Sequence, residues 1–160
     1  MIDFINCIQE KGFLLSEVVP QDLDRFIRIE NMTHYKYVND FKEFFGEYDE
    51  TVIVNNFYLR QKMTFFQKIM YQGENVGFFS YNIKNDTIER VYIRIAEKFQ
   101  NRGIGSLFLT YIKQIADESC VSVEFVAINT NPAIILYKRM GFELFKKDHV
   151  FSYFRYEKNK

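Results

Sequence analysis

The clearest periodic pattern in the chain is an apolar helix face that begins just after Gly103. Its members recur at three- and four-residue spacing, which is the period of an amphipathic helix. They are Ile104, Leu107, Phe108, Tyr111, Ile112, Ile115 and Ala116. Residues 88–95 predict a strand, so the local order is strand, short polar loop with two glycines, helix.

Shorter patterns on either side of this segment predict a mixed α/β domain. Further strands are predicted at residues 13–19, 65–71, 76–83, 121–128, 142–146 and 150–156. Further helices are predicted at residues 3–11, 20–30, 37–45, 49–63 and 132–140. With turns at residues 72–75 and 84–86, we expect about seven strands with helices on both faces. No linker or repeat divides residues 1–160, so we expect one domain.

The loop before the long helix has the residue types of an anion site. Gly103 and Gly105 leave no side chain in the way of a ligand, and a helix start offers free N–H groups to a phosphate. A P-loop would need lysine after Gly105, where Ser106 stands, and the dinucleotide fingerprint would need a third glycine at Phe108. Both of these common alternatives are therefore excluded.

Composition narrows the class of protein. Lysine plus arginine equals aspartate plus glutamate at 21 each, so there is no charge excess for nucleic acid or an anionic membrane. The 18 Phe and 11 Tyr predict an aromatic core, and an acceptor pocket is the other use that they allow.

Cysteine and histidine usage predicts neither disulfides nor a metal site. Cys7 and Cys120 lie far apart, which favours a reducing, cytoplasmic compartment. His34 and His149 have no partner spacing for a metal, so we expect ordinary surface or core histidines. Asp3 and the absence of a basic start do not fit a signal peptide, and no apolar run approaches the ~18 residues of a membrane span.

Two motifs in the right order resemble one known family. Residues 100–105 match Gln/Arg-x-x-Gly-x-Gly/Ala, the pyrophosphate loop of the GNAT superfamily of acetyl-CoA-dependent N-acetyltransferases. Residues 131–142 resemble its second pattern, Asn-x-Ala-x-x-x-Tyr followed by Gly-Phe. If only one motif were present, Tyr137 would be interpreted as a packed aromatic side chain and Asn131 as a helix cap. The resemblance covers roughly residues 76–156, and residues 20–63 carry no matching motif.

The resemblance implies the GNAT acyl-CoA N-acyltransferase fold, a mixed, mostly antiparallel sheet whose fourth and fifth strands splay apart. Acetyl-CoA would enter between residues 88–95 and 121–128, without a metal. The implied coenzyme-binding residues are Ile93, Arg94, Ile95, Gln100, Asn101, Arg102, Gly103, Ile104, Gly105, Ser106, Asn131, Tyr137 and Lys138. Lys138 and its neighbour Arg139 would reach phosphates, although two solvated surface charges fit the pattern equally well.

The reaction needs a base, because a lysine-like amine has a pKa of ~10.4 and arrives as ammonium. Glu89 lies eleven residues before Gln100, which resembles family members that use a strand glutamate. Strand alternation predicts that Glu89 shares a face with Val91, Ile93 and Ile95. A glutamate that reaches solvent or pairs with arginine fits equally, and Asp86 and Glu124 are the alternative bases.

Tyr137 is the expected acid that protonates the leaving thiolate. The sequence therefore predicts direct acetyl transfer from acetyl-CoA to a primary amine in a ternary complex. The rival is a non-catalytic acyl-CoA-binding module of the same fold. The early helices and last strands, which contact acceptors in this family, carry no motif, so the acceptor stays open. Exposed C-terminal strands would allow a homodimer.

Overall fold

The computed structural model describes residues 3–158, and its centre is one open seven-stranded sheet of order β1-β2-β3-β4-β5-β7-β6. Every neighbouring pair is antiparallel except β4 and β5, which are parallel. The strands are β1 Phe13–Glu17, β2 Phe65–Tyr71, β3 Glu74–Lys84, β4 Thr87–Ile95, β5 Ser122–Ile128, β6 Glu143–Lys147 and β7 Phe151–Tyr156. The seven predicted strands are thus confirmed, with small shifts at their ends.

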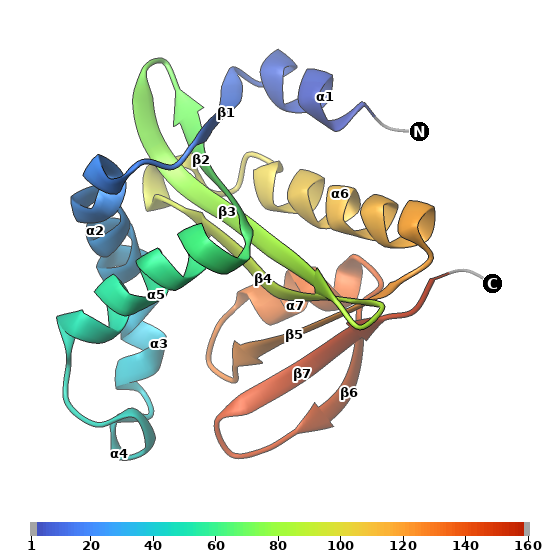
Figure 1. Ribbon diagram of the computed structural model, residues 1–160. Coiled ribbons are helices and arrows are strands. Elements are labelled where there is room, and N and C mark those ends of the chain that lie inside the picture. Colours follow the sequence, from blue (N-terminus) through green and yellow to red (C-terminus); the bar gives the residue numbers. More distant parts are fainter. Residues whose placement is uncertain (1–2, 159–160) are drawn as a thin grey trace.

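Helices cover both faces of the sheet, as the sequence predicts (Figure 1). The helices are α1 Phe4–Glu10, η1 Pro20–Asp22, α2 Leu23–Thr33, α3 Tyr35–Asn39, α4 Lys42–Phe45, α5 Glu50–Met63, η2 Glu97–Phe99, α6 Ile104–Ser119 and α7 Ala133–Arg139. Helices α1 and α6 lie on one face, and α2 and α5 lie on the other. Within residues 3–158, no helix is long and apolar enough to cross a membrane.

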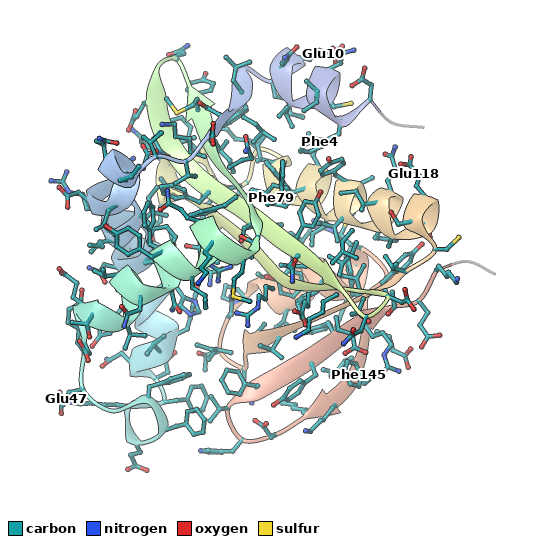
Figure 2. The ribbon with its side chains drawn as sticks, in the orientation of Figure 1. Phe4, Glu10, Glu47, Phe79, Glu118 and Phe145 are labelled. Atoms are coloured by element: carbon teal, nitrogen blue, oxygen red, sulfur yellow. The ribbon has the colours of Figure 1, made fainter. Side chains whose placement is uncertain are left out.

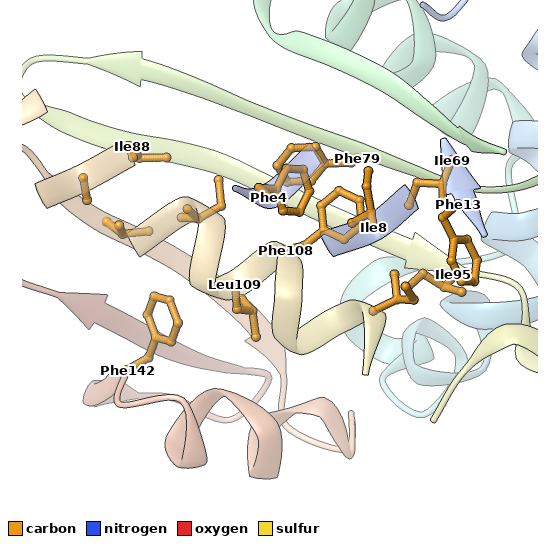
Figure 3. Close-up of a cluster of buried hydrophobic side chains, with 14 of the residues drawn as sticks. Phe4, Ile8, Phe13, Ile69, Phe79, Ile88, Ile95, Phe108, Leu109 and Phe142 are labelled. Carbon is orange, nitrogen blue, oxygen red and sulfur yellow. The ribbon is translucent and has the colours of Figure 1, made fainter. Parts of the chain in front are cut away.

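Two aromatic clusters hold these layers together. On the α6 side, Phe4 and Phe79 both contact Phe108, with ring centroids 5.0 and 4.5 Å apart (Figure 3). On the α2 side, Phe26 packs against Phe78 at 5.2 Å. Phe78 and Phe79 are adjacent in β3 and point to opposite faces, because side chains alternate along a strand. The predicted aromatic core is confirmed.

The prediction of one helix over residues 37–45 is wrong, because the chain forms the two short helices α3 and α4. The helix breaks at Phe41, whose φ of −123° and ψ of 43° are not helical. Tertiary contacts explain the break: Asp40 accepts a hydrogen bond from Thr130 at 2.7 Å, and Phe41 packs against His149. These partners are distant in sequence, so local periodicity carries no sign of them.

The turn between β2 and β3 is tighter than the predicted residues 72–75. Only Gln72 and Gly73 lie outside the strands, and both have positive φ, at 49° and 80°. This is the two-residue geometry that matches the twist of a hairpin.

Strands β4 and β5 pair only at Thr87↔Ser122 and Ile88↔Val123 and then separate. The predicted splay is therefore confirmed, and the edge of β4 beyond Ile88 faces an opening instead of a neighbouring strand. The backbone N–H and C=O groups along this edge are available to a ligand.

A β-bulge in β4 corrects the expected position of Glu89. Asn82 of β3 pairs with Glu89 and Ser80 pairs with Tyr92, so two residues of β4 oppose one of β3. Arg90, inside the bulge, has a φ of +54°. The extra residue reverses the alternation. Glu89 therefore shares the α2 face with Tyr92, and the prediction that it lies with Val91, Ile93 and Ile95 is wrong.

Candidate active site

Two cavities of about 560 and 590 Å³ lie along the splay between β4 and β5. The smaller one reaches the β6–β7 hairpin, and we call it the hairpin cavity. The larger one reaches the glycine loop, and we call it the loop cavity. Both are lined by the same six residues where they meet: His34, Ile93, Arg94, Leu109, Asn131 and Tyr137. A ligand in one cavity can therefore approach a ligand in the other beside Tyr137.

The loop cavity is lined by the start of α6. Gly103 is the N-cap with a φ of +78°, and no side chain caps the helix. The first N–H groups of α6 have no helical partner and lie at the positive end of the helix dipole. Gly103, Gly105 and Ser106 line the cavity beside them. This arrangement suits a phosphate or pyrophosphate.

The two glycines meet different requirements. Gly103 needs its left-handed backbone, which residues with a Cβ rarely adopt. At Gly105 a Cβ would make only an ordinary contact with Leu136, at 3.4 Å. The protein therefore has room for a side chain at residue 105, and the empty space faces the cavity. The residues of the loop fit a coenzyme pyrophosphate that approaches the backbone closely.

Not every predicted loop residue presents a side chain to this cavity. Gln100 lines it and donates to the carbonyl of Ile95 at 2.8 Å, which fixes the loop to the end of β4. Arg102 instead lies over the ring of Phe99 at 5.1 Å, and Ile104 is buried in the core. Only backbone groups of residues 102 and 104 remain for the predicted coenzyme contacts.

The start of α7 contributes the next group of predicted residues. Asn131 accepts a hydrogen bond from the N–H of Ala133 at 2.9 Å, one residue before the N-cap position at Pro132, and lines both cavities. Lys138 is exposed and lines neither cavity. Its neighbour Arg139 lines the loop cavity, so Arg139 is the cation of this pair that lies beside the start of α6.

Tyr137 is held rigidly at the junction of the cavities. Its ring packs edge-on against Phe125 and Phe154, with centroids 4.8 and 5.4 Å away. Burial raises the pKa of Tyr137 above its ordinary value, although the nearby charge of Arg94 acts in the opposite direction. The hydroxyl is therefore protonated at neutral pH and can donate a hydrogen bond.

Two carboxylates line the hairpin cavity from opposite strands of the splay. Glu89 of β4 lies 3.9 Å from Arg90 Nε and accepts a hydrogen bond from Asn82 at 3.4 Å. Glu124 of β5 accepts a shorter bond from Arg155 Nε, at 3.1 Å. Asp86, the third candidate base, is in the turn at the closed end of the splay and lines neither cavity.

The wall of the hairpin cavity contains a charged cluster that the sequence analysis missed. Glu30 of α2 accepts hydrogen bonds from Arg94 Nε at 3.0 Å and from the hydroxyl of Tyr92. Burial alone would raise the pKa of Glu30, but Arg94, His34 and the Tyr92 hydrogen bond together hold it below its ordinary value. Arg60 of α5 stacks over the Tyr92 ring at 4.0 Å. The cluster spans residues 30–94, so no local spacing reveals it.

His34 is the neutral member of this cluster and lines both cavities. Burial and the charge of Arg94 lower the pKa of His34 to about 4. Its Nδ1 atom is buried without a hydrogen-bond partner among residues 3–158. The sequence analysis predicts an ordinary surface or core histidine, and it does not predict that His34 lines both cavities together with Tyr137. The same part of the chain contains no group of three or more metal-ligating side chains.

The comparisons agree with this geometry. No curated protein matches the sequence. PaiA N-acetyltransferase from Thermoplasma acidophilum, solved in complex with coenzyme A, superposes with a TM-score of 0.68 at 14% identity, covering 92% of this chain and 99% of that one.

Two other solved acetyltransferases superpose with slightly lower TM-scores. The one from Thermus thermophilus has a TM-score of 0.66 at 17% identity, covering 91% and 96% of the two chains. An N-acetyltransferase from Staphylococcus aureus has a TM-score of 0.65 at 16% identity, covering 91% and 98%. At these identities the likeness concerns the fold.

The sequence itself matches a family model, described as the acetyltransferase (GNAT) family, over residues 28–142. That match spans more than half of the chain and includes the glycine loop, Glu89 and Tyr137. The chain therefore belongs to the GNAT acetyltransferase family.

Proposed function

We propose that this protein transfers an acetyl group from acetyl-CoA directly to a primary amine while both substrates are bound. The observation that carries the proposal is the meeting of two cavities beside Tyr137. The loop cavity has the features of an anion site at a helix start, and the hairpin cavity has two carboxylates suited to a cationic amine. Two ligands can thus meet without a covalent enzyme intermediate.

The loop cavity would take the coenzyme. Free N–H groups at the start of α6 would bind the pyrophosphate, with Arg139 nearby for further phosphate charge. The open edge of β4 at Ile93, Arg94 and Ile95 would hydrogen-bond the amide-rich pantetheine arm. The acetyl thioester would then lie beside Tyr137, at the junction with the acceptor. The free thiols of Cys7 and Cys120 fit a cytoplasmic location.

The chemistry divides between Glu89 and Tyr137. Glu89, directly or through a water, takes the proton that the ammonium must lose, so that the nitrogen lone pair can attack the thioester carbonyl. Tyr137 donates its proton to the sulfur as the carbon–sulfur bond breaks, and the second proton that the nitrogen loses returns to Tyr137 directly or through water. Glu89 is preferred to Glu124, because Glu124 is held more closely by its arginine, at 3.1 against 3.9 Å. The β-bulge beside Glu89 directs its side chain toward the acceptor side.

The test has a binding arm and an activity arm. Calorimetry should detect acetyl-CoA binding that weakens about tenfold or more in Gly105→Val, because the side chain occupies the pyrophosphate space. Ser119→Val, exposed at the opposite end of α6, should bind like wild type. A panel of primary amines should release free CoA thiol above background. Binding without transfer to any amine would identify the non-catalytic module instead, and equal affinity of both variants would contradict the loop site.

A further inference from the structure

Arg60 of α5 is a cation without a carboxylate partner in the wall of the hairpin cavity. Its Nη1 donates to Ser80 Oγ at 2.9 Å and to the carbonyl of Arg90 at 3.5 Å. Its Nε is buried and has no hydrogen-bond partner among residues 3–158. Burial lowers the pKa of Arg60 below its ordinary value. Burial of this guanidinium therefore costs free energy, which the Tyr92 ring at 4.0 Å and the nearby charge of Glu30 offset in part.

Glu30 and the two carboxylates that line the hairpin cavity with Arg60 each have another arginine as their nearest cation. Glu30 accepts from Arg94 at 3.0 Å, and Glu124 accepts from Arg155 at 3.1 Å. Glu89 has Arg90 as its nearest cation, at 3.9 Å. Within residues 3–158, no carboxylate forms a salt bridge with Arg60. The cavity wall thus has an excess of positive charge at one point.

In the proposed arrangement, an anion that pairs with Arg60 would not be a coenzyme phosphate. Arg60 lines the hairpin cavity and not the loop cavity, where the start of α6 and Arg139 lie. The negative group that reaches Arg60 would therefore belong to the acceptor.

We propose that the acceptor is an amino acid with an apolar side chain, whose carboxylate binds Arg60 while its amine lies near Glu89 and Tyr137. This inference rests on the proposed acetyl transfer and specifies its substrate class. A guanidinium fork matches a carboxylate geometrically. Nε is buried and Nη1 already donates to Ser80 and the Arg90 carbonyl, so the carboxylate would bind the Nη2 end of the guanidinium.

The rest of the hairpin cavity suits an apolar side chain. Besides Tyr92 and Tyr137, five aromatic residues line it, from α4, β5 and the β6–β7 hairpin: Phe45, Phe125, Phe145, Phe151 and Tyr153. Figure 2 shows Phe145 on strand β6 of this hairpin. An apolar or aromatic side chain would be buried against these rings, which favours such amino acids over polyamines.

The test compares acceptors that differ only in the carboxylate. The pairs are L-phenylalanine with 2-phenylethylamine and L-leucine with isopentylamine, with rates expressed per concentration of unprotonated amine. Wild type should favour the amino acid by on the order of 10- to 100-fold in kcat/KM, the effect of a charged hydrogen bond in a buried site. Arg60→Met should abolish the preference, and Arg60→Lys should keep part of it. The control is Arg25→Met, an arginine bonded to Glu74 and outside both cavities.

A binding measurement covers the case in which Arg60 variants fail to fold. Calorimetry of wild-type protein with CoA should then detect tighter binding of L-phenylalanine than of 2-phenylethylamine. Equal binding or equal kcat/KM of the pair in wild type would overturn the inference, as would an undiminished preference in a folded Arg60→Met. Absence of transfer to every amine, with or without a carboxylate, would instead contradict the proposed function.

Discussion

The two cavities that meet at Tyr137 are built in different ways. The loop cavity takes most of its lining from two continuous segments, residues 93–109 and 131–139. The hairpin cavity takes side chains from α4, α5, the bulge of β4, β5 and the β6–β7 hairpin. The cavity proposed for the coenzyme is therefore built from nearby residues, and the cavity proposed for the acceptor is an assembly of distant side chains.

The two cavities therefore limit substitutions in different ways: the loop cavity through backbone conformation, and the hairpin cavity through pairs of buried charges. Backbone N–H groups at a helix start need only glycine and the right turn, so many sequences can build the same anion site. Buried charges such as Glu30 and Arg94 must be mutually compensated, so each depends on residues far away in the chain. Substitutions of the buried charges should therefore change both stability and acceptor use. Substitutions in the glycine loop should change coenzyme binding alone.

The largest expected effect is on the charged cluster. Glu30→Gln removes the partner of Arg94, whose side chain is only 20% exposed, and leaves two buried cations together. We expect the free energy of unfolding in urea to fall by about 3–5 kcal/mol. Glu74→Gln is the control, because its pairs with Arg25 and Lys98 are exposed and should contribute less than about 1 kcal/mol. A loss in Glu30→Gln no larger than in Glu74→Gln would contradict the importance of this cluster.

The pH dependence of stability tests the same region through His34. Its pKa is about 4 in the folded chain, against an ordinary 6.5, so the unfolded chain binds the extra proton first as pH falls. The free energy of unfolding is therefore highest above about pH 6.5, with respect to His34. It falls between about pH 6.5 and 4, by on the order of 3 kcal/mol. His34→Gln should remove that slope from urea titrations, whereas His149→Gln, on the surface, should retain it. Parallel slopes in wild type and His34→Gln would show that His34 is not held neutral.

Tyr137→Phe should affect chemistry at the junction while sparing both cavities. Phenylalanine keeps the ring contacts with Phe125 and Phe154 and removes only the proposed donor to sulfur. We expect kcat to fall on the order of 10²-fold, since a thiolate leaves tolerably well without an acid. Acetyl-CoA affinity by calorimetry should be nearly unchanged. Full kcat with a good amine, or a large loss of thermal stability without a catalytic defect, would leave Tyr137 with a packing role only.

Glu89→Gln should give the smallest loss of activity, and only at pH values well below the pKa of the amine. Near pH 7 we expect kcat/KM to fall about tenfold or more, because the amine arrives protonated. Near the pKa of the amine the difference should shrink, since little proton transfer is then needed. Glu124→Gln is the matched variant on the opposite strand and should retain most activity. The reverse order of the two losses would make Glu124 the base.

The sequence by itself determined the features that depend on neighbouring residues. Hydrophobic periodicity and glycine placement identify the strand, loop and helix around Gly103 and Gly105, because backbone conformation there is set within a few residues. The order of the two motifs then indicated the family and the splay of the sheet. Even Asn131, read as a cap, has the expected short-range bond to Ala133.

Only the tertiary structure decided the acceptor side. The bulge at Arg90 adopts a positive φ without a glycine, so no residue type announces it, and it turns Glu89 to the opposite face. The break at Phe41 and the grouping of Arg60 with Arg94 depend on contacts between segments tens of residues apart. Such contacts form because burial and charge compensation act through space, and the spacing of residues along a chain does not encode which distant partners will meet.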